Sequence, residues 1–180
     1  MGIIFEEEER NHTVLEVAKR MMAAARTAPK GCGVDNLCIA ILDKPGIELL
    51  AAKMTELAET GAASKTFLRD AANLLQAEAL VLIGTKIRPL GLKYCGLCGF
   101  ANCEEKAQHP NHPCAFNTGD LGIAIGSAVS VAMEARLDNR VMYTVGMAAR
   151  ELKYLGADCR IIYGIPLSCT GKNPFFDRKQ

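Results

Sequence analysis

Four of the chain's eight cysteines lie close together in the middle of the sequence, in the spacing Cys-x2-Cys-x4-Cys-x10-Cys. They are Cys95, Cys98, Cys103 and Cys114. Thiolates are soft ligands, and four of them suit an iron–sulfur cluster or a zinc ion. The x2 spacing lets two sulfurs bind one centre from a single tight turn. The pattern therefore predicts a metal site in this segment.

Two glycines directly follow the first two cysteines, at Gly96 and Gly99. Glycine adopts the unusual dihedral angles that a tight turn needs, and it leaves backbone N–H groups free to point at sulfur. Such hydrogen bonds stabilise the negative charge of a thiolate centre and adjust its reduction potential. We therefore expect both glycines to belong to the site.

Zinc is the competing interpretation of the same cysteines. Structural zinc sites commonly pair two short Cys-x2-Cys turns, whereas the second half here is spread over x4 and x10. His109 and His112 lie in the same segment and are alternative ligands, although the turn-rich stretch AQHPNHP is typical of a surface loop. The spacing favours an iron–sulfur cluster and leaves zinc open.

The other four cysteines carry less information. Cys38 and Cys159 fall in apolar runs and are predicted to be core residues, because a buried free cysteine behaves as a small hydrophobe. Cys32 lies between two glycines in an expected loop, and Cys169 follows the last apolar run. Without an export signal, eight cysteines indicate metal or redox chemistry more than a disulfide framework.

Composition narrows the class of protein. The 180 residues are 49% apolar and carry a net charge of +1, which predicts a single domain over residues 1–180 with a real core. The near-balanced charge argues against nucleic acid or an anionic membrane as a partner. The acidic start MGIIFEEEER lacks a secretory pattern, and the apolar stretch Leu121–Met133 is too short to span a bilayer. We therefore expect a cytoplasmic protein.

Hydrophobic periodicity predicts helices separated by short apolar strands. The expected helices span Glu6–Ala28, Asp43–Gly61, Ser64–Gln76, Thr118–Leu137 and Gly146–Leu155, and the expected strands span Asn36–Leu42, Glu78–Lys86 and Cys159–Leu167. This alternation predicts an α+β (mixed α/β) fold, with helices packed on a small mixed sheet. The cysteine segment, residues 91–116, is then a metal-binding loop inserted into this single domain.

The helix after the cysteine segment is predicted to be the central one. Asn117 is its expected cap, and Asp120 suits a capping box. Its apolar residues lie nearly all round the helix, which predicts burial in the middle of the molecule.

The stretch CGLCGFANC resembles the C-G-x-C-G-x-x-x-C segment of four-iron iron–sulfur domains in electron-transfer subunits of anaerobic metabolism. Three cysteines and both glycines match, and the last cysteine follows sooner than is usual there. The resemblance implies a [4Fe-4S] cluster with Cys95, Cys98, Cys103 and Cys114 as its ligands.

A second resemblance covers most of the chain. The stretch MMAAARTAPKGCGVDNLCIAIL is similar to the early segment of nitroreductase-type flavoproteins, and GDLGIAIGSAVSVAMEARLDN resembles their central helix. With the cysteine motif, the chain resembles the ferredoxin-domain-containing proteins of nitroreductase-like fold found in anaerobic bacteria and archaea. The resemblance implies a homodimer, because nitroreductase-like proteins form their cofactor pocket between two subunits.

The chain departs from typical nitroreductases where the flavin phosphate is held. Those proteins place arginines before the first helix, whereas this chain has the acidic run EEEER, which repels a phosphate. If FMN binds, Lys30, Gly31 and Lys172 are the candidate phosphate contacts.

These observations predict an iron–sulfur redox protein that passes electrons to a flavin or to a partner protein. The resemblance to nitroreductases implies an oxidoreductase, and whether the chain is itself an enzyme is left open. The alternative is a non-catalytic binding module in which zinc or a structural cluster staples the loop.

Overall fold

A computed structural model of the chain describes residues 2–176, so Met1 and residues 177–180 of the predicted domain lie outside the description. Along the described chain the elements are α1 (Glu6–Thr27), η1 (Gly31–Gly33), β1 (Leu37–Leu42), α2 (Lys44–Glu59), α3 (Thr66–Leu74), β2 (Ala79–Lys86), α4 (Cys103–Ala107), α5 (Ala115–Glu134), β3 (Asp138–Asn139), α6 (Tyr143–Glu151) and β4 (Cys159–Ser168). Within residues 2–176, every helix falls short of the length and apolar character that a bilayer-crossing segment needs.

The sheet has four strands in the order β1-β2-β4-β3, and each neighbouring pair is antiparallel. The prediction of a mixed sheet was therefore wrong. The reason lies in the connection between β1 and β2, which contains two helices, α2 and α3. One helix would carry the chain to the far end of the sheet, whereas two return it to the end from which it left.

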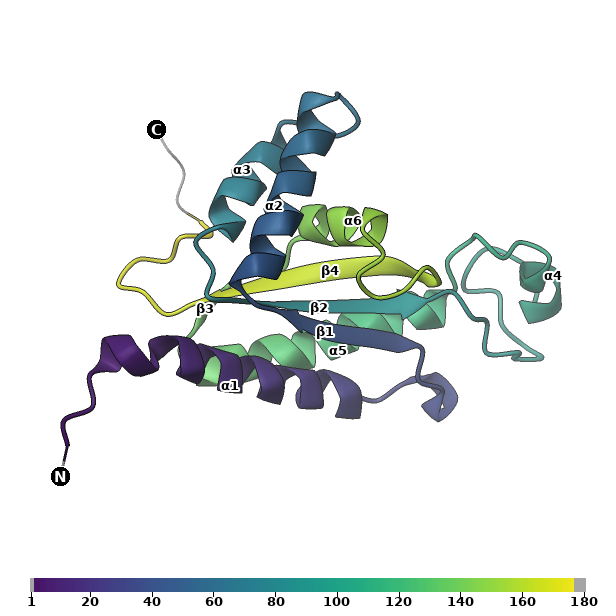
Figure 1. Ribbon diagram of the computed structural model, residues 1–180. Coiled ribbons are helices and arrows are strands. Elements are labelled where there is room, and N and C mark those ends of the chain that lie inside the picture. Colours follow the sequence, from purple (N-terminus) through teal and green to yellow (C-terminus); the bar gives the residue numbers. More distant parts are fainter. Residues whose placement is uncertain (1, 177–180) are drawn as a thin grey trace.

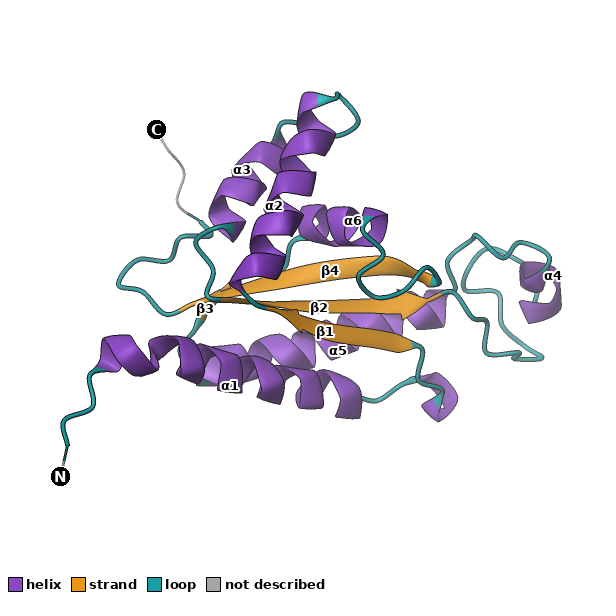
Figure 2. Cartoon of the chain, in the orientation of Figure 1, coloured by secondary structure: helices purple, strands orange, loops and turns teal. Residues whose placement is uncertain are grey.

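Helices cover both faces of the sheet (Figures 1 and 2). Helices α1 and α5 pack on one face, where Val81, Ile83 and Ile165 contribute to the core. Helices α2, α3 and α6 pack on the other, over Leu80 and Leu82 of the same central strand. Because β2 is buried on both faces, its sequence is a continuous apolar run without alternation.

The first half of the chain folds as its periodicity predicts. The apolar residues that repeat at helical spacing in α1 are Val14, Val17, Ala18, Met21, Met22 and Ala25. All of them are buried except Met22, which is partly buried. Helix α2 begins where the Asp43 side chain accepts a hydrogen bond from the Gly46 N–H at 3.3 Å, with a proline in the first turn.

Helix α5 differs from the prediction at its start and in its burial. It begins three residues early, with Cys114 as the N-cap, so Asn117 lies inside the first turn and does not cap the helix. One face packs on α1 and the sheet, where Ser127 Oγ donates to Ala24 O at 3.1 Å. The opposite face is open within the single chain, with Ile123 50% and Met133 57% exposed.

Three parts of the chain meet at one end of the sheet. The strand registers place the start of β1 and the start of β4 beside the end of β2. The segment that carries the four cysteines leaves β2 at this end, and Figure 1 shows it projecting beyond the strands together with α4. This end of the sheet therefore positions the predicted site.

Candidate metal centre

The four predicted ligands lie along one projecting segment, and all four are free thiols. Cys95 and Cys98 lie in its irregular part, and Cys103 is the first residue of α4. These three are partly buried, whereas Cys114 is only 5% exposed. The loop thus has three accessible thiols and one that is fixed to the body of the fold.

The segment between the first two cysteines ends in the predicted tight turn. The Gly99 N–H donates to Gly96 O at 3.0 Å, and Gly99 has a φ of 89°, which a side chain would disfavour. The turn prediction is confirmed. The Gly99 N–H is used within the turn, however, and is not free to point at sulfur as the sequence suggested.

The described thiols do not converge on one point. Within residues 2–176, no group of three or more histidine, cysteine, aspartate or glutamate side chains is arranged to hold a metal ion. Cys95 instead borders a hollow of about 490 Å³ with Leu92 and Phe116, and Cys103 borders a second hollow of about 470 Å³. The donor set therefore fits a thiolate-bound metal in its chemistry, and the loop leaves open space beside two of the thiols.

The fixed end of the loop is held by polar contacts at the end of β2. The Arg88 N–H donates to Asn117 Oδ1 at 2.8 Å, which anchors the departing chain to the first turn of α5. Lys86 Nζ lies 2.7 Å from Asp158, and this hydrogen bond holds the pKa of the carboxyl below its usual value. These contacts tie β2, α5 and β4 together under the cysteines.

Two buried polar side chains in this region were not predicted as part of the site. Lys106 in α4 is 1% exposed, and its Nζ donates to His109 O at 3.3 Å. Asn117 is also 1% exposed, and among residues 2–176 its Nδ2 finds no hydrogen-bond partner. One feature of the sequence could have pointed to both residues: each follows a predicted cysteine ligand by three residues.

The two loop histidines lie against an aromatic ring. The His109 ring stacks on Phe100 with centroids 4.9 Å apart, and His112 meets the same ring edge-on at 5.5 Å. Both histidines are exposed and Phe100 is partly buried, so this three-ring group lies at the surface of the loop, as the turn-rich stretch predicts. As alternative zinc ligands the histidines stay a prediction.

The candidate flavin-phosphate residues are divided between the two ends of the sheet. Lys30 Nζ donates to carbonyl oxygens at the end of α1, including Ala28 O at 2.7 Å. The Gly31 N–H donates to Asp120 Oδ1 at 3.0 Å, a carboxylate that disfavours a phosphate nearby. Lys172 follows the far end of β4 and is exposed. The structure does not bring Lys172 to the other two, and their role in flavin binding stays a prediction.

The remaining cysteines match their predicted environments in part. Burial raises the pKa of the Cys159 thiol to about 12, and the neighbouring Cys38 thiol, within hydrogen-bonding reach, adds to the shift. Cys159 is therefore an unreactive core thiol. Cys32, in its expected loop, is exposed and has a φ of 54° between its two glycines.

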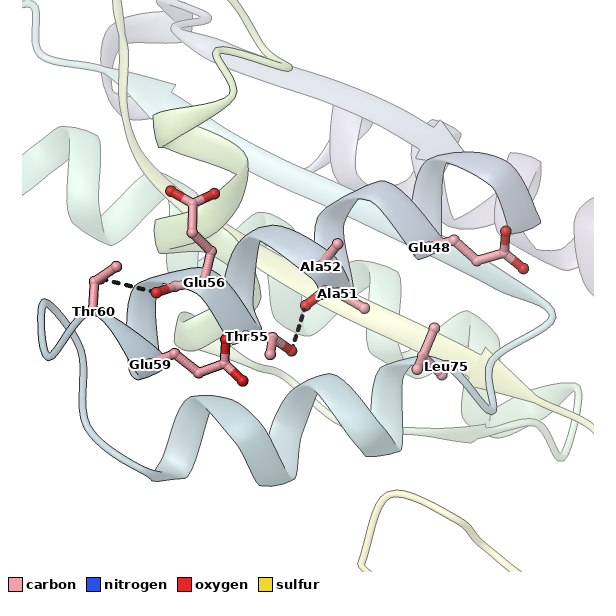
Figure 3. Close-up of a pocket in the computed structure, with 8 residues that line it drawn as sticks. All are labelled: Glu48, Ala51, Ala52, Thr55, Glu56, Glu59, Thr60 and Leu75. Atoms are coloured by element: carbon pink, nitrogen blue, oxygen red, sulfur yellow. Dashed lines mark hydrogen bonds between the residues drawn. The ribbon is translucent and has the colours of Figure 1, made fainter.

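A further hollow, of about 420 Å³, lies between α2 and α3. Figure 3 shows its carboxylates, Glu48, Glu56 and Glu59, pointing in different directions. The hydroxyls of Thr55 and Thr60 donate to carbonyl oxygens of their own helix. The hollow thus has no convergent polar groups, and the cysteine loop is the better candidate site.

Comparisons with known proteins show the family to which the chain belongs. A family model described as "Uncharacterized protein containing a ferredoxin domain (DUF2148)" matches residues 111–178. A relative from Archaeoglobus fulgidus, described as an uncharacterized protein, is 42% identical over 98% of this chain and 97% of its own length. The chain belongs to this ferredoxin-domain family. Of the four predicted ligands, Cys114 lies within the matched residues, and the other three precede them.

Solved structures similar to this ferredoxin-domain protein include proteins that are named for a flavin. A BluB-like flavoprotein from Clostridium difficile 630 has a TM-score of 0.61 and 21% identity, covering 92% of this chain and 83% of its own. The FMN and NADPH-dependent nitroreductase NfnB from Sphigopyxis sp. strain HMH has a TM-score of 0.58 and 10% identity, covering 92% and 83%. These likenesses confirm the predicted nitroreductase-like fold.

Proposed function

We propose that the chain is an iron–sulfur redox protein that binds a [4Fe-4S] cluster through Cys95, Cys98, Cys103 and Cys114. One observation carries the proposal: four free thiols belong to a single projecting loop at one end of a nitroreductase-like sheet. Membership of a family with a ferredoxin domain supports the same chemistry. A cluster bound there supplies reversible one-electron transfer.

In this proposal, one cysteine is a fixed ligand and the other three come from the loop. Cys114, at the start of α5, provides a fixed sulfur, and the three partly buried thiols close on the centre from the loop. Because these thiols do not converge in the described chain, metal binding is coupled to ordering of the loop. Gly91 and Gly99, both with positive φ, are points at which the loop changes direction.

Electron transfer is the proposed use of the site because the loop lies on the surface. Cys95 and Cys98 are accessible, and their neighbours Tyr94 and Leu97 are 100% and 73% exposed. A redox partner protein can therefore approach the loop directly. A flavin is the alternative acceptor, since similar structures include an FMN-dependent nitroreductase by name.

The competing function is a non-catalytic module whose loop is stapled by zinc or by a structural cluster. The packed rings of His109 and His112 favour it, because histidine nitrogen is an ordinary zinc ligand. Zinc has no redox chemistry at physiological potentials, so electron uptake separates the two functions.

Reversible reduction is the experiment that tests the proposed function. The visible absorption of protein purified without oxygen should decrease when dithionite supplies one electron per chain. A mild oxidant should restore that absorption. Transfer to added FMN or to a ferredoxin-type acceptor should follow. A visible spectrum that stays unchanged under reductant would support the structural module and reject electron transfer.

We further propose that the protein is cytoplasmic and forms a homodimer. Eight free cysteines fit a reducing compartment. The open face of α5, with Ile123 and Met133 exposed, is apolar enough to pack against a second copy.

A further inference from the structure

Lys106 is a cation placed where a cation is unfavourable. Its side chain is among the largest fully buried ones in the described chain, at 1% exposure. An ammonium has three N–H donors, and in residues 2–176 the one acceptor found for it is His109 O, at the long distance of 3.3 Å. Burial of a charge without an opposite charge is costly.

The nearby carboxylates do not neutralise Lys106. Within the described residues it forms no ion pair with Glu104 or Glu105, although both lie in the same short helix. The Glu105 carboxylate instead accepts a hydrogen bond from the Ala101 N–H at 2.6 Å. Within residues 2–176, the buried amino group of Lys106 therefore has no carboxylate partner.

Asn117, in the first turn of α5, is a second buried donor without a hydrogen-bond acceptor among the described residues. The Arg88 N–H donates to Asn117 Oδ1, so the amide oxygen must face Arg88 and the NH₂ group must face the other way. That NH₂ group is buried and has no partner. Lys106 follows Cys103 by three residues within α4, and residues three apart on a helix lie on one face. Asn117 lies in the first turn of α5, three residues after its N-cap Cys114.

We propose that Lys106 and Asn117 are the donors that compensate the negative charge of the thiolate-bound cluster, and that Lys106 raises its reduction potential. This inference rests on the proposed function. A four-thiolate cluster is negatively charged, and reduction adds one more negative charge. A buried ammonium therefore stabilises the reduced state more than the oxidised state, and hydrogen bonds to sulfur act in the same direction.

The test compares Lys106→Met with a matched control, Lys93→Met. Methionine keeps the length and flexibility of lysine without its charge. Lys93 lies in the same loop but is exposed, so its charge is screened by water and salt. Lys106→Arg keeps the charge and serves as the rescue variant. The midpoint potential is measured by redox titration of the reconstituted full-length proteins, and the melting temperature is measured on the metal-free proteins.

In the reconstituted protein we expect Lys106→Met to raise the ratio of oxidised to reduced cluster about tenfold at a fixed potential. For a one-electron couple this is a fall in midpoint potential of about 59 mV. Lys93→Met and Lys106→Arg should stay near the wild-type value. In the metal-free protein Lys106→Met should melt about 3 °C higher or more, because the unpaired buried charge is gone.

The outcomes separate the inference from the proposed function. Iron analysis of the reconstituted wild type comes first, and a wild type without iron rejects the proposed function and the inference with it. If the wild type binds the cluster but Lys106→Met matches Lys93→Met in midpoint potential, the inference is overturned and the proposed function stands. A metal-free Lys106→Met that melts lower than wild type would also count against an uncompensated charge.

Discussion

At the scale of single residues, Cys114 links the cysteine loop to the body of the fold. It is buried, and its carbonyl oxygen accepts the first hydrogen bond of α5, from the Thr118 N–H at 3.1 Å. Of the four proposed ligands, Cys114 is therefore the one whose position depends least on the loop.

Replacement of Cys114 tests whether it is the fourth ligand. We expect Cys114→Ser to lower iron affinity roughly 10-fold or more, because a thiolate is lost from the one fixed position. The measurement is iron content per chain after anaerobic reconstitution at limiting iron.

The matched control for this experiment is Cys32→Ser. Cys32 lies at the same end of the sheet, outside the predicted motif, and is exposed. We expect its replacement to leave iron content unchanged. An equal loss of iron in both variants would show that the choice of Cys114 is wrong.

Residue types and spacing single out four candidate ligands, which stay a prediction, but they could not predict the burial of Lys106 or Asn117. Lysine and asparagine are ordinary surface residues in a polar loop, and their burial arises from how the loop folds back on α4 and α5. Asn117 was interpreted as a helix cap because its type suits one. The helix starts earlier, at Cys114, and this turns a capping residue into a buried one.

At the scale of elements, helix α6 packs against β4 so closely that there is no room for a side chain at Gly146. A Cβ on Gly146 would lie 1.7 Å from Ile162 O, and both groups belong to backbone that cannot move aside locally. This contact fixes the start of β4, and therefore one side of the sheet end that supports the cysteine loop.

We expect Gly146→Ala to destabilise the protein by about 3 kcal/mol, because the methyl group overpacks a backbone contact. The melting temperature of the metal-free protein should fall by roughly 10 °C. The control is Met147→Ala, in the same helix, whose side chain is 38% exposed and whose change should be within about 0.5 kcal/mol of zero. Similar stabilities for the two variants would contradict the close packing described.

Long periodic elements could be predicted, whereas short ones could not. Helices α1 and α2 and strands β1 and β2 lie within two residues of their expected bounds, because each has a clear apolar pattern. Helix α4 has five residues, too few to show a period, and it begins where the Asn102 side chain accepts from the Glu105 N–H. The two-residue strand β3 depends on pairing with β4 alone.

At the scale of the whole molecule, the chain presents a cysteine loop at one end and an open helix face along one side. The nitroreductase-like fold could be recognised from the sequence through its early segment and central helix. Burial of that helix on all sides could not be confirmed in one chain, since Ile123 is 50% exposed. A second copy that covers this face would reconcile the apolar sequence with the exposure.

We expect Ile123→Glu to weaken the proposed homodimer roughly 100-fold, since it would bury an unpaired carboxylate in the proposed interface. Light scattering coupled to size exclusion, over a range of protein concentrations, measures the change. Leu49→Glu is the control, because Leu49 is 65% exposed on α2, over the opposite face of the sheet. A wild type that is monomeric at every concentration would contradict the dimer.

The central claim is that the cysteine loop holds an iron–sulfur cluster, and the most direct measurement is the iron, acid-labile sulfide and zinc content of protein purified without oxygen. The account predicts four iron and four sulfide per chain and no zinc, with all iron lost when Cys95 and Cys98 are both replaced by serine. One zinc per chain, with neither iron nor sulfide after reconstitution, would contradict it.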